Sequence, residues 1–285
     1  MRKISYILTA GLLMAGAAQA ANINWSGGGA TDDWNDTANW GGAVLGTNTA
    51  DQAVFNGAGD SNTPTTDFAF AEASNLTTRN EAHITIGTGV NISGFGAWRL
   101  GANNANGGGH ITMTGGSLDG VSLQVASSPT ASSRSSFTVS GGSLTTSGTL
   151  SLGSLADFNL TGNAASFDVA SFTAGNGSIF NATYSSGMST IDAGSVNINA
   201  EGALLNVDLG TYAGTGVFDL ITFDSLTSGY ASGNVVFSGL DGGRTATLES
   251  DADSLYVHVI PEPATLGLVI ALGSGLIVVR RFFRI

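Results

Sequence analysis

The 285-residue chain contains no cysteine, only 4 prolines and only 9 lysine and arginine residues. The absence of cysteine excludes a disulfide scaffold and every zinc or iron–sulfur site that uses thiolate ligands. The shortage of basic residues and the formal net charge of −12 argue against nucleic-acid binding, because phosphate contacts need lysine and arginine. A simply disordered chain is not expected either, since 42% of the residues are hydrophobic.

Two of the few basic residues stand at the very start of the chain. Arg2 and Lys3 precede an apolar stretch over residues 4–18, which runs into the small-residue cleavage pattern Ala18-Gln19-Ala20. A positive start, an apolar stretch and such a tripeptide are typical of a secretory signal peptide. We therefore expect residues 1–20 to direct export of the chain.

The C-terminal end combines a short motif, an apolar run and a basic tail. Pro261-Glu262-Pro263 is followed by the run 264–279 and then by Arg280, Arg281 and Arg284. As a helix the run would rise ~24 Å, slightly less than a ~30 Å hydrocarbon core, and flanking arginines can absorb the mismatch. Basic residues beyond the span place the C-terminus in the cytoplasm and the bulk of the chain outside. The sequence predicts one transmembrane helix over 264–279.

These C-terminal features, confined to residues 260–285, resemble the PEP-CTERM sorting signal of exported bacterial proteins. The resemblance implies that an exosortase, a membrane-embedded cysteine protease, recognises Pro261, Glu262 and Pro263 and cleaves near them. It further implies passage through the inner membrane to the cell surface or the extracellular matrix, in a bacterium that makes extracellular polysaccharide. It implies nothing about the chemistry of the domain between the two ends.

Residues 21–202 carry an internal repeat of short strand-like runs. The phrase Ile111-Thr-Met-Thr-Gly-Gly-Ser-Leu118 returns 26 residues later as Phe137-Thr-Val-Ser-Gly-Gly-Ser-Leu144, and looser copies begin at Phe158 and Ile179. A period of about 20–30 residues without a helix predicts a right-handed parallel β-helix, an all-β solenoid. A β-sandwich is the alternative, although it would not repeat a phrase at nearly constant separation. After each copy we expect one further strand, over 121–125, 149–152, 167–169 and 189–191.

The two ends of such an array need atypical residues, because a terminal turn exposes apolar side chains and unpaired edges. Residues 203–260 hold longer, more hydrophobic runs and are expected to form a C-terminal β cap with hairpins. At the other end Trp25, Trp34 and Trp40 lie within 16 residues. Their spacing resembles the opening of autotransporter-like β-helix repeat proteins, which implies a β-helix and no enzymatic activity. The three rings either plug the first turn or form a platform for stacking on sugars.

Two acidic clusters are candidates for calcium binding. Asp32, Asp33 and Asp36 lie between the tryptophans, and Asp251 and Asp253 lie near the end of the domain. Neither cluster has the spacing of a known calcium loop. Solvated surface carboxylates are therefore the favoured interpretation, and we expect neither a metal site nor a cofactor.

The sequence does not favour catalysis. Polysaccharide lyases and hydrolases need paired carboxylates or a basic residue beside an acidic cluster. Residues 21–260 contain no lysine, and their four arginines are widely scattered. The histidines His83, His110 and His258 each lie in a separate strand-like run, where an ordinary strand-face role is expected.

Together these features predict an exported, exosortase-sorted surface or matrix protein with a structural or adhesive role. A carbohydrate-binding adhesin that uses the tryptophans and a polysaccharide-degrading β-helix enzyme are the alternatives. Residues 21–260 hold 20 acidic and 4 basic residues, a net charge of −16. Such a surface repels anionic polymers unless divalent cations bridge them.

Overall fold

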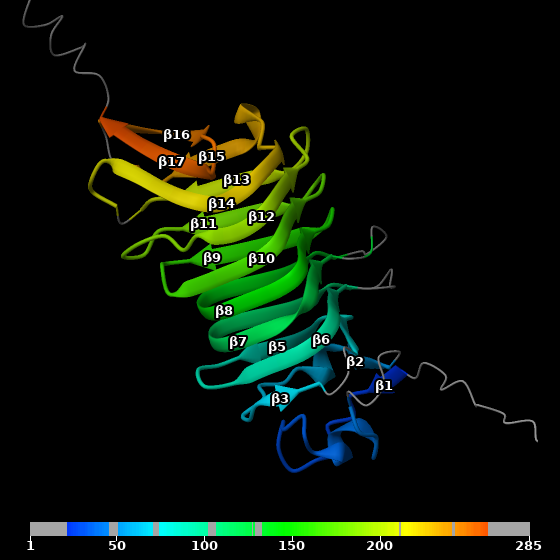
Figure 1. The fold of residues 1–285 in the computed structure, drawn as a ribbon. Coiled ribbons are helices and arrows are strands. Elements are labelled where there is room, and N and C mark those ends of the chain that lie inside the picture. The colour runs from blue at the N-terminus through cyan, green and yellow to red at the C-terminus, as the bar shows by residue number, and fades with distance from the viewer. Residues whose placement is uncertain are drawn as a thin grey trace, which may run out of the picture.

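The computed structural model describes residues 22–45, 51–70, 74–101, 107–126, 128, 133–210, 212–240 and 243–261. It is an all-β protein in which parallel strands stack into a β-solenoid of about six turns (Figure 1). The strands are β1 (Asn22–Asn24), β2 (Gln52–Asn56), β3 (Phe68–Ala69), β4 (Asn75–Arg79), β5 (Ala82–Ile86), β6 (Asn91–Leu100), β7 (Gly109–Val125), β8 (Ser135–Leu152), β9 (Ala156–Thr161), β10 (Ala165–Ala174), β11 (Ile179–Thr183), β12 (Ile191–Ile198), β13 (Leu204–Asp208), β14 (Gly216–Ser228), β15 (Val235–Ser238), β16 (Arg244–Ser250) and β17 (Ser254–Pro261). Three short 3₁₀ helices are η1 (Thr37–Trp40), η2 (Ala58–Asp60) and η3 (Ser232–Asn234).

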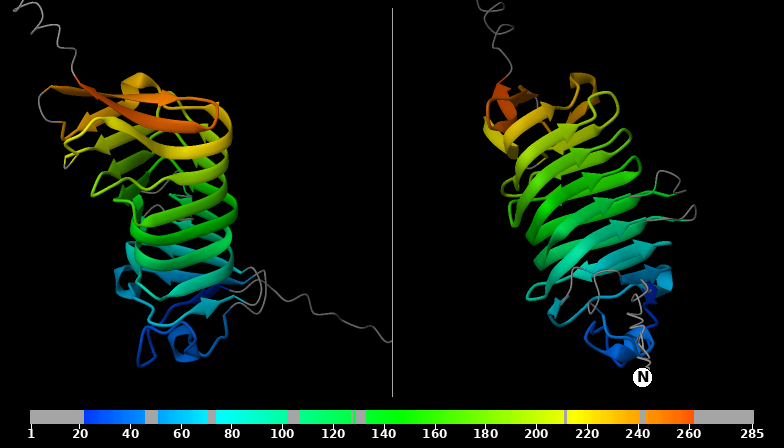
Figure 2. Two further views of the ribbon diagram at one scale, coloured as in Figure 1. Left: turned by 60° about the vertical axis from the view of Figure 1, so that its left-hand side comes forward. Right: turned by 45° about the vertical axis from the view of Figure 1, so that its right-hand side comes forward.

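From β5 onward each turn passes through three strand segments, so the stacked turns form three parallel faces, and Figure 2 shows the stack from two sides. Face 1 consists of β5, residues 109–113 of β7, residues 135–139 of β8, β9, β11, β13 and β15. Face 2 consists of β3, residues 91–93 of β6, 117–120 of β7, 143–146 of β8, 165–169 of β10, 191–193 of β12 and 221–223 of β14. Face 3 consists of β1, β2, β4, residues 97–100 of β6, 122–125 of β7, 149–152 of β8, 171–174 of β10, 195–198 of β12 and 225–228 of β14.

The repeated phrase sets the register between neighbouring turns, as the sequence predicts. Ile111 lies beside Phe137, and Leu118 lies beside Leu144, all four with buried side chains. In parallel strands side chains alternate between the interior and the outside, so identical phrases place like residues over like residues. The observed parallel registers are those of a solenoid, and the alternative of a β-sandwich is not realised.

The fourth copy of the phrase is displaced by one residue from the expectation. Phe180, and not Ile179, lies beside Phe158. Phe180 is buried and Ile179 is half-buried. A shift of one residue exchanges the inward-facing and outward-facing side chains of a strand. The observed register buries the aromatic ring of Phe180 in place of the smaller Ile179 side chain.

The expectation of one further strand per copy is also corrected, because each turn has two. Residues 149–152 lie on face 3, whereas residues 167–169 lie on face 2 beside 144–146. β7 and β8 run through the corner between these faces at Asp119-Gly120 and Ser147-Gly148, and the register shifts there. A bulge of this kind bends the strand without ending it.

The corner between face 1 and face 2 depends on glycine. Gly116 and Gly142 hold the left-handed backbone conformation, with φ of 66° and 93°. A Cβ added at Gly116 would lie 2.1 Å from the carbonyl oxygen of Val90 in the preceding turn. The glycine of the repeated phrase is therefore required both by conformation and by the closeness of the neighbouring turn.

The interior is a continuous column of apolar side chains. Phe137, Phe158 and Phe180 stack in successive turns, with ring centroids 5.5 and 5.0 Å apart and interplanar angles of 11° and 20°. All three rings are no more than 1% exposed. Because each turn buries its apolar side against the next, the stack does not depend on disulfides.

The parallel array extends further toward the C-terminus than the expected boundary at residue 203. β13 pairs in parallel with β11, β14 with β12, and β15 with β13. Antiparallel pairing begins only with the β16–β17 hairpin, which joins the array through β14. The C-terminal cap is therefore this hairpin, and the longer runs before it belong to the solenoid.

The expected signal peptide (1–20) and transmembrane helix (264–279) lie outside the described residues. Among the described residues, no helix has the length and apolar character needed to cross a membrane.

Candidate functional site

Face 3 carries two outward columns of small polar side chains. Five consecutive strand segments read Ser-Leu-Gln-Val, Thr-Leu-Ser-Leu, Ser-Phe-Thr-Ala, Ser-Val-Asn-Ile and Ser-Leu-Thr-Ser, over 122–125, 149–152, 171–174, 195–198 and 225–228. The apolar second residue of each segment packs against the interior. The residues on either side of it point outward, and they are serine, threonine, asparagine or glutamine.

This absence of charge distinguishes face 3 from its neighbours. The outward side of face 2 holds Asp119, Asp168 and Asp192, and the last two lie directly beside each other. The outward side of face 1 holds His110 and Asp157. Over the same turns, the described strand segments of face 3 carry no ionisable side chain, although the chain has 21 acidic residues.

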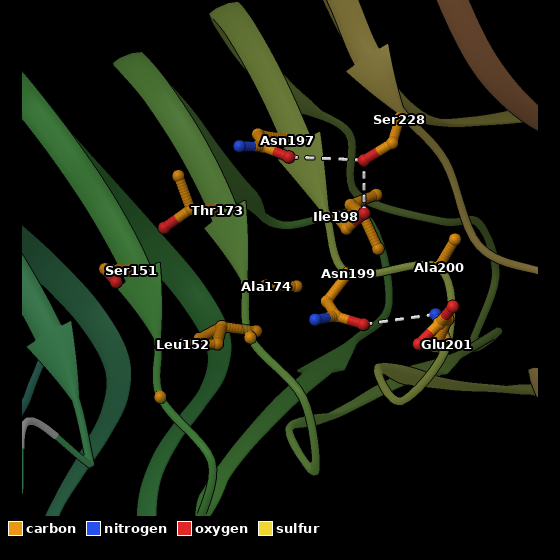
Figure 3. A pocket seen from close by; sticks show the side chains of 12 residues that line it. Ser151, Leu152, Thr173, Ala174, Asn197, Ile198, Asn199, Ala200, Glu201 and Ser228 are labelled. Atoms are coloured by element: carbon orange, nitrogen blue, oxygen red, sulfur yellow. Dashed lines mark hydrogen bonds between the residues drawn. The ribbon is translucent and has the colours of Figure 1, made fainter. Parts of the chain in front are cut away.

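A groove crosses the C-terminal ends of these strands (Figure 3). It arises from the lengths of the connections that lead from face 3 to face 1. Those after β8 and β10 have three and four residues, 153–155 and 175–178. The connection after β14, over 229–234, is longer. Short connections therefore form the floor of the groove, which has a volume of about 610 Å³.

The groove is lined by hydroxyl and amide groups from four turns. Ser228 Oγ donates hydrogen bonds to Asn197 Oδ1, at 3.2 Å, and to the carbonyl oxygen of Ile198. Asn199 Oδ1 accepts a hydrogen bond of 3.1 Å from the amide of Glu201, which fixes the turn that follows β12. The lining is completed by Ser151, Leu152, Gly153, Thr173, Ala174, Gly175 and Ala200.

Apart from Glu201, the groove offers uncharged hydrogen-bond donors and acceptors. A serine or threonine hydroxyl and an asparagine amide each act as donor and acceptor. Ser151, Thr173 and Asn197 lie in register in successive turns, so these groups repeat at the strand spacing of about 4.8 Å. Glu201, in the turn after β12, is the one ionisable residue among those that line the groove. Such a surface is suited to a neutral polymer that carries many hydroxyl groups.

The three tryptophans that were expected either as a plug or as a glycan platform lie in the interior. Trp25, Trp34 and Trp40 are 6%, 1% and 3% exposed. The ring of Trp40 makes edge contacts with those of Trp25 and Trp34, at centroid distances of 4.9 and 6.3 Å. Trp34 also packs against Phe55 and Trp98. A ring covered in this way cannot stack on a sugar, so the structure corrects the platform expectation, and the three residues close the first turns.

The acidic clusters serve the local backbone. Asp36 Oδ1 accepts a hydrogen bond from the amide of Ala38 and caps η1. The hydroxyl of Thr66 and the amide of Asn35 hydrogen-bond to Asp33 and lower the pKa of its carboxyl group. The amides of Asp253 and Ser254 similarly lower the pKa of Asp251 in the turn between β16 and β17. No cluster of three or more potential metal ligands occurs among the residues that the structure describes.

The structure brings two of the three histidines together, which the sequence analysis did not predict. His83 and His110 lie in register on face 1, with ring centroids 6.1 Å apart. They are 27 residues apart, which is the length of one turn, so the repeat period itself was the available signal. Burial, and then the charge of the nearby His110, lower the pKa of His83.

His110 also joins a serine and a glutamate. Its Nδ1 lies 2.9 Å from Ser136 Oγ, and its Nε2 lies 3.0 Å from Glu81 Oε2. The hydroxyl of Ser133 and then His110 hydrogen-bond to Glu81 and lower the pKa of its carboxyl group. Glu81 is held at φ 67°, an uncommon conformation for a residue other than glycine.

This Ser136–His110–Glu81 chain has the connectivity of a hydrolytic triad but not the surroundings of one. Acyl transfer needs amide donors aimed at the developing oxyanion. The nearby amide of Gly108 already donates to Glu81 Oε1 and to Ser133 Oγ. The cluster therefore connects Glu81, in the turn after β4, with His110 of β7 and with residues at and just before the start of β8.

Comparison with family models, with characterised proteins and with solved structures gives no match. The function must therefore be argued from the residues of this chain.

The predicted sorting motif lies at the end of the last strand. Pro261 is the final residue of β17 and lies beside Arg244 of β16. Glu262, Pro263, Arg280, Arg281 and Arg284 lie outside the described residues. The first residue of the motif is thus also the last residue of the closing hairpin.

Proposed function

We propose that the chain is an exported bacterial surface or extracellular-matrix protein that an exosortase sorts, with a structural and adhesive rather than an enzymatic role. In this proposal residues 1–20 direct export and residues 264–279 form a transmembrane helix that Arg280, Arg281 and Arg284 stop. The exosortase acts at Pro261–Pro263. The proposed coil is right-handed, the hand that parallel crossover connections nearly always adopt.

The stacked architecture supports the structural part of this role. Each strand segment pairs with the turns directly before and after it, so the solenoid is an elongated element with long, regular outer faces. The expected processing site follows within two residues of the closing hairpin. Cleavage there would release the solenoid with all of its strands intact.

The uncharged segments of face 3, from 122–125 to 225–228, carry the adhesive part of the proposal. Polymers with carboxylate groups are repelled by a domain of net charge −16, whereas neutral polymers are not. Face 3 and its groove offer hydroxyl and amide groups in register over successive turns. We infer that this face binds a neutral polysaccharide of the extracellular layer.

Replacing the motif tests the sorting part. In a host with an exosortase, the variant Pro261→Ala/Glu262→Ala/Pro263→Ala should remain full-length in the inner-membrane fraction. The wild-type chain should be shortened and recovered beyond that membrane. Immunoblots of fractionated cells, with an antibody against the solenoid, give both the size and the location.

The variant Pro64→Ala is the matched control for this experiment, because it removes a proline far from the C-terminus. It should be processed like the wild type. Normal processing of the triple alanine variant would refute the role of Pro261–Pro263 as a sorting signal.

A further inference from the structure

The two ends of the solenoid are closed to different degrees. At the N-terminal end, the three buried tryptophans cover the interior. At the C-terminal end, the β16–β17 hairpin extends face 2 through β14. β15, the last strand of face 1, pairs through one edge with β13, and none of the described strands is in register with its second edge. A strand edge without a partner strand can accept another strand.

β15 lacks the features that protect an edge strand from association. Its sequence is Val-Val-Phe-Ser, with no charged residue and no proline. The edge strand of the neighbouring hairpin, β16, carries Arg244 and Glu249 instead. Charged residues on an edge normally discourage pairing with another chain. Of these two edge strands, β15 and β16, only β15 lacks charged residues that would discourage pairing.

Exposed apolar side chains also gather at this end of face 1. Val236, in the middle of β15, is 57% exposed. Leu204, in the preceding turn, is 38% exposed. Val235 and Phe237 point the other way and pack, half-buried, against the apolar interior.

The interior is incompletely filled just behind this strand. A cavity of about 370 Å³ is lined by Val235 and Phe237 of β15 and by Ala246 and Leu248 of β16. Tyr230 also lines it, and its hydroxyl is buried without a hydrogen-bond partner. Buried polar groups normally have a hydrogen-bond partner. The unpaired Tyr230 hydroxyl and the cavity therefore show that packing at this end is incomplete.

We propose that β15 docks a second copy of this chain, tail to tail about a two-fold axis, through antiparallel pairing of β15 with β15 of the second copy. Directly opposite residues in an antiparallel pair lie on the same side of the sheet. An axis through Val236 therefore places Val236 opposite Val236 of the second copy, on the outside. It places Val235 opposite Phe237 of the second copy, on the inside.

This arrangement explains the features of the edge together. The exposed Val236 is covered by its own equivalent, face 1 continues into the second copy, and the two incompletely filled ends close against each other. The absence of charge on β15 matters because two chains of net charge −12 repel each other elsewhere. A contact that uses the same patch on both copies is closed and stops at the dimer. The inference stands on β15 alone and does not rest on the proposed function.

A single introduced cysteine tests the contact, because the chain has none of its own. In Val236→Cys the two thiols would lie on directly opposite residues, whose Cα atoms are about 4.5–5.5 Å apart in an antiparallel pair. That separation is suitable for a disulfide. Mild oxidation of the purified full chain should convert most of it to a species of twice the monomer mass on a non-reducing gel.

Val217→Cys is the matched control, since Val217 is 55% exposed on β14 but lies beside His258 of β17 rather than on an open edge. It should remain monomeric under the same oxidation. Equal cross-linking of both variants would show random collisions and overturn the proposal. A Val236→Cys chain that stays monomeric, or that cross-links only to a different protein, would also overturn it.

A second variant tests the contact without oxidation. Val236→Lys places like charges opposite each other, and it should raise the dimer dissociation constant at least tenfold in light scattering of the full chain in detergent. Because Val236 is exposed, the substitution leaves the interior unchanged. A mass that is monomeric for the wild type, or unchanged between the wild type and Val236→Lys, would refute the dimer.

Discussion

Replacement of Phe158 by alanine should lower the free energy of unfolding by about 3–5 kcal/mol, the usual cost of removing a buried phenylalanine side chain. The ring is fully buried and lies between Phe137 and Phe180 of the adjacent turns. Phe167 contacts it from face 2, with centroids 5.7 Å apart. Side chains from three successive turns therefore meet at Phe158, and the cavity left by alanine would interrupt the interior column. Urea titration of the full chain in detergent, followed by circular dichroism, measures the change.

Thr161→Ala is the control for this prediction. Thr161 is the last residue of the same strand, β9, and points outward on face 1. Substitutions at such surface positions usually change stability by about 0.5 kcal/mol or less. If Phe158→Ala cost no more than Thr161→Ala, the continuous core that holds the stack together would be contradicted.

Substitution of Gly116 by alanine should be comparably damaging for a different reason. The backbone at Gly116 is left-handed, which costs other residues about 1–2 kcal/mol. In addition, the new Cβ would lie 2.1 Å from the carbonyl oxygen of Val90 and 2.6 Å from that of Gly87. Both atoms belong to the backbone of the preceding turn, so the turns must move apart. We expect a total loss of about 3 kcal/mol or more in the same titration.

Gly89 separates these two contributions. It occupies the equivalent corner of the preceding turn with φ 81°, but a Cβ there would meet nothing within 4 Å. Gly89→Ala should therefore cost only the conformational part, about 1–2 kcal/mol. Equal losses for the two variants would show that the close approach of the turns does not contribute.

The sequence predicts the solenoid because two copies of the repeat are closely similar over eight residues, at 111–118 and 137–144. The two copies share both glycines and the same inward positions, so their register follows from alignment alone. At the fourth copy the glycine pair is missing, and the alignment is displaced by one residue. Burial of Phe180 then decides between two registers that the local sequence does not distinguish.

The third face was not predicted, because only single glycines, Gly120 and Gly148, mark its corner within otherwise strand-like runs. β7 and β8 continue through it with a shift in register, and the strand-like pattern is hardly interrupted. For the same reason the sequence analysis missed the groove, whose lining includes residues of the segments 171–174 and 195–198, which had not been expected as a third face. The signal that could have revealed face 3 is the pattern of a polar, an apolar and a polar residue at the end of five successive turns.

The tryptophans show a limit of another kind. Their clustering marks the N-terminal end correctly, but composition cannot tell whether an aromatic ring faces inward or outward. Here the interior of the first turns is wide enough for Trp34 to pack against Phe55, Phe68 and Trp98. Burial of such large rings is strongly favourable, and it leaves the adhesive role to other residues.

Binding of neutral polysaccharide to face 3 is the central claim, and a paired binding assay tests it most directly. The full chain in detergent is titrated against a neutral glucan, galactan and mannan and against the carboxymethylated form of each. At least one neutral polymer should bind, and its carboxymethylated form should bind more weakly because the domain is acidic.

The variant Thr173→Ala/Asn197→Ala should weaken that binding roughly 5- to 100-fold, since each hydrogen bond contributes about 0.5–1.5 kcal/mol. Thr145→Ala/Ser166→Ala, on the outward side of face 2, is the matched control and should bind like the wild type. Loss of affinity confined to the first variant is the result that we predict. If the chain bound none of the neutral polymers, or if the two variants bound with equal affinity, the assignment of face 3 as the adhesive surface would be contradicted.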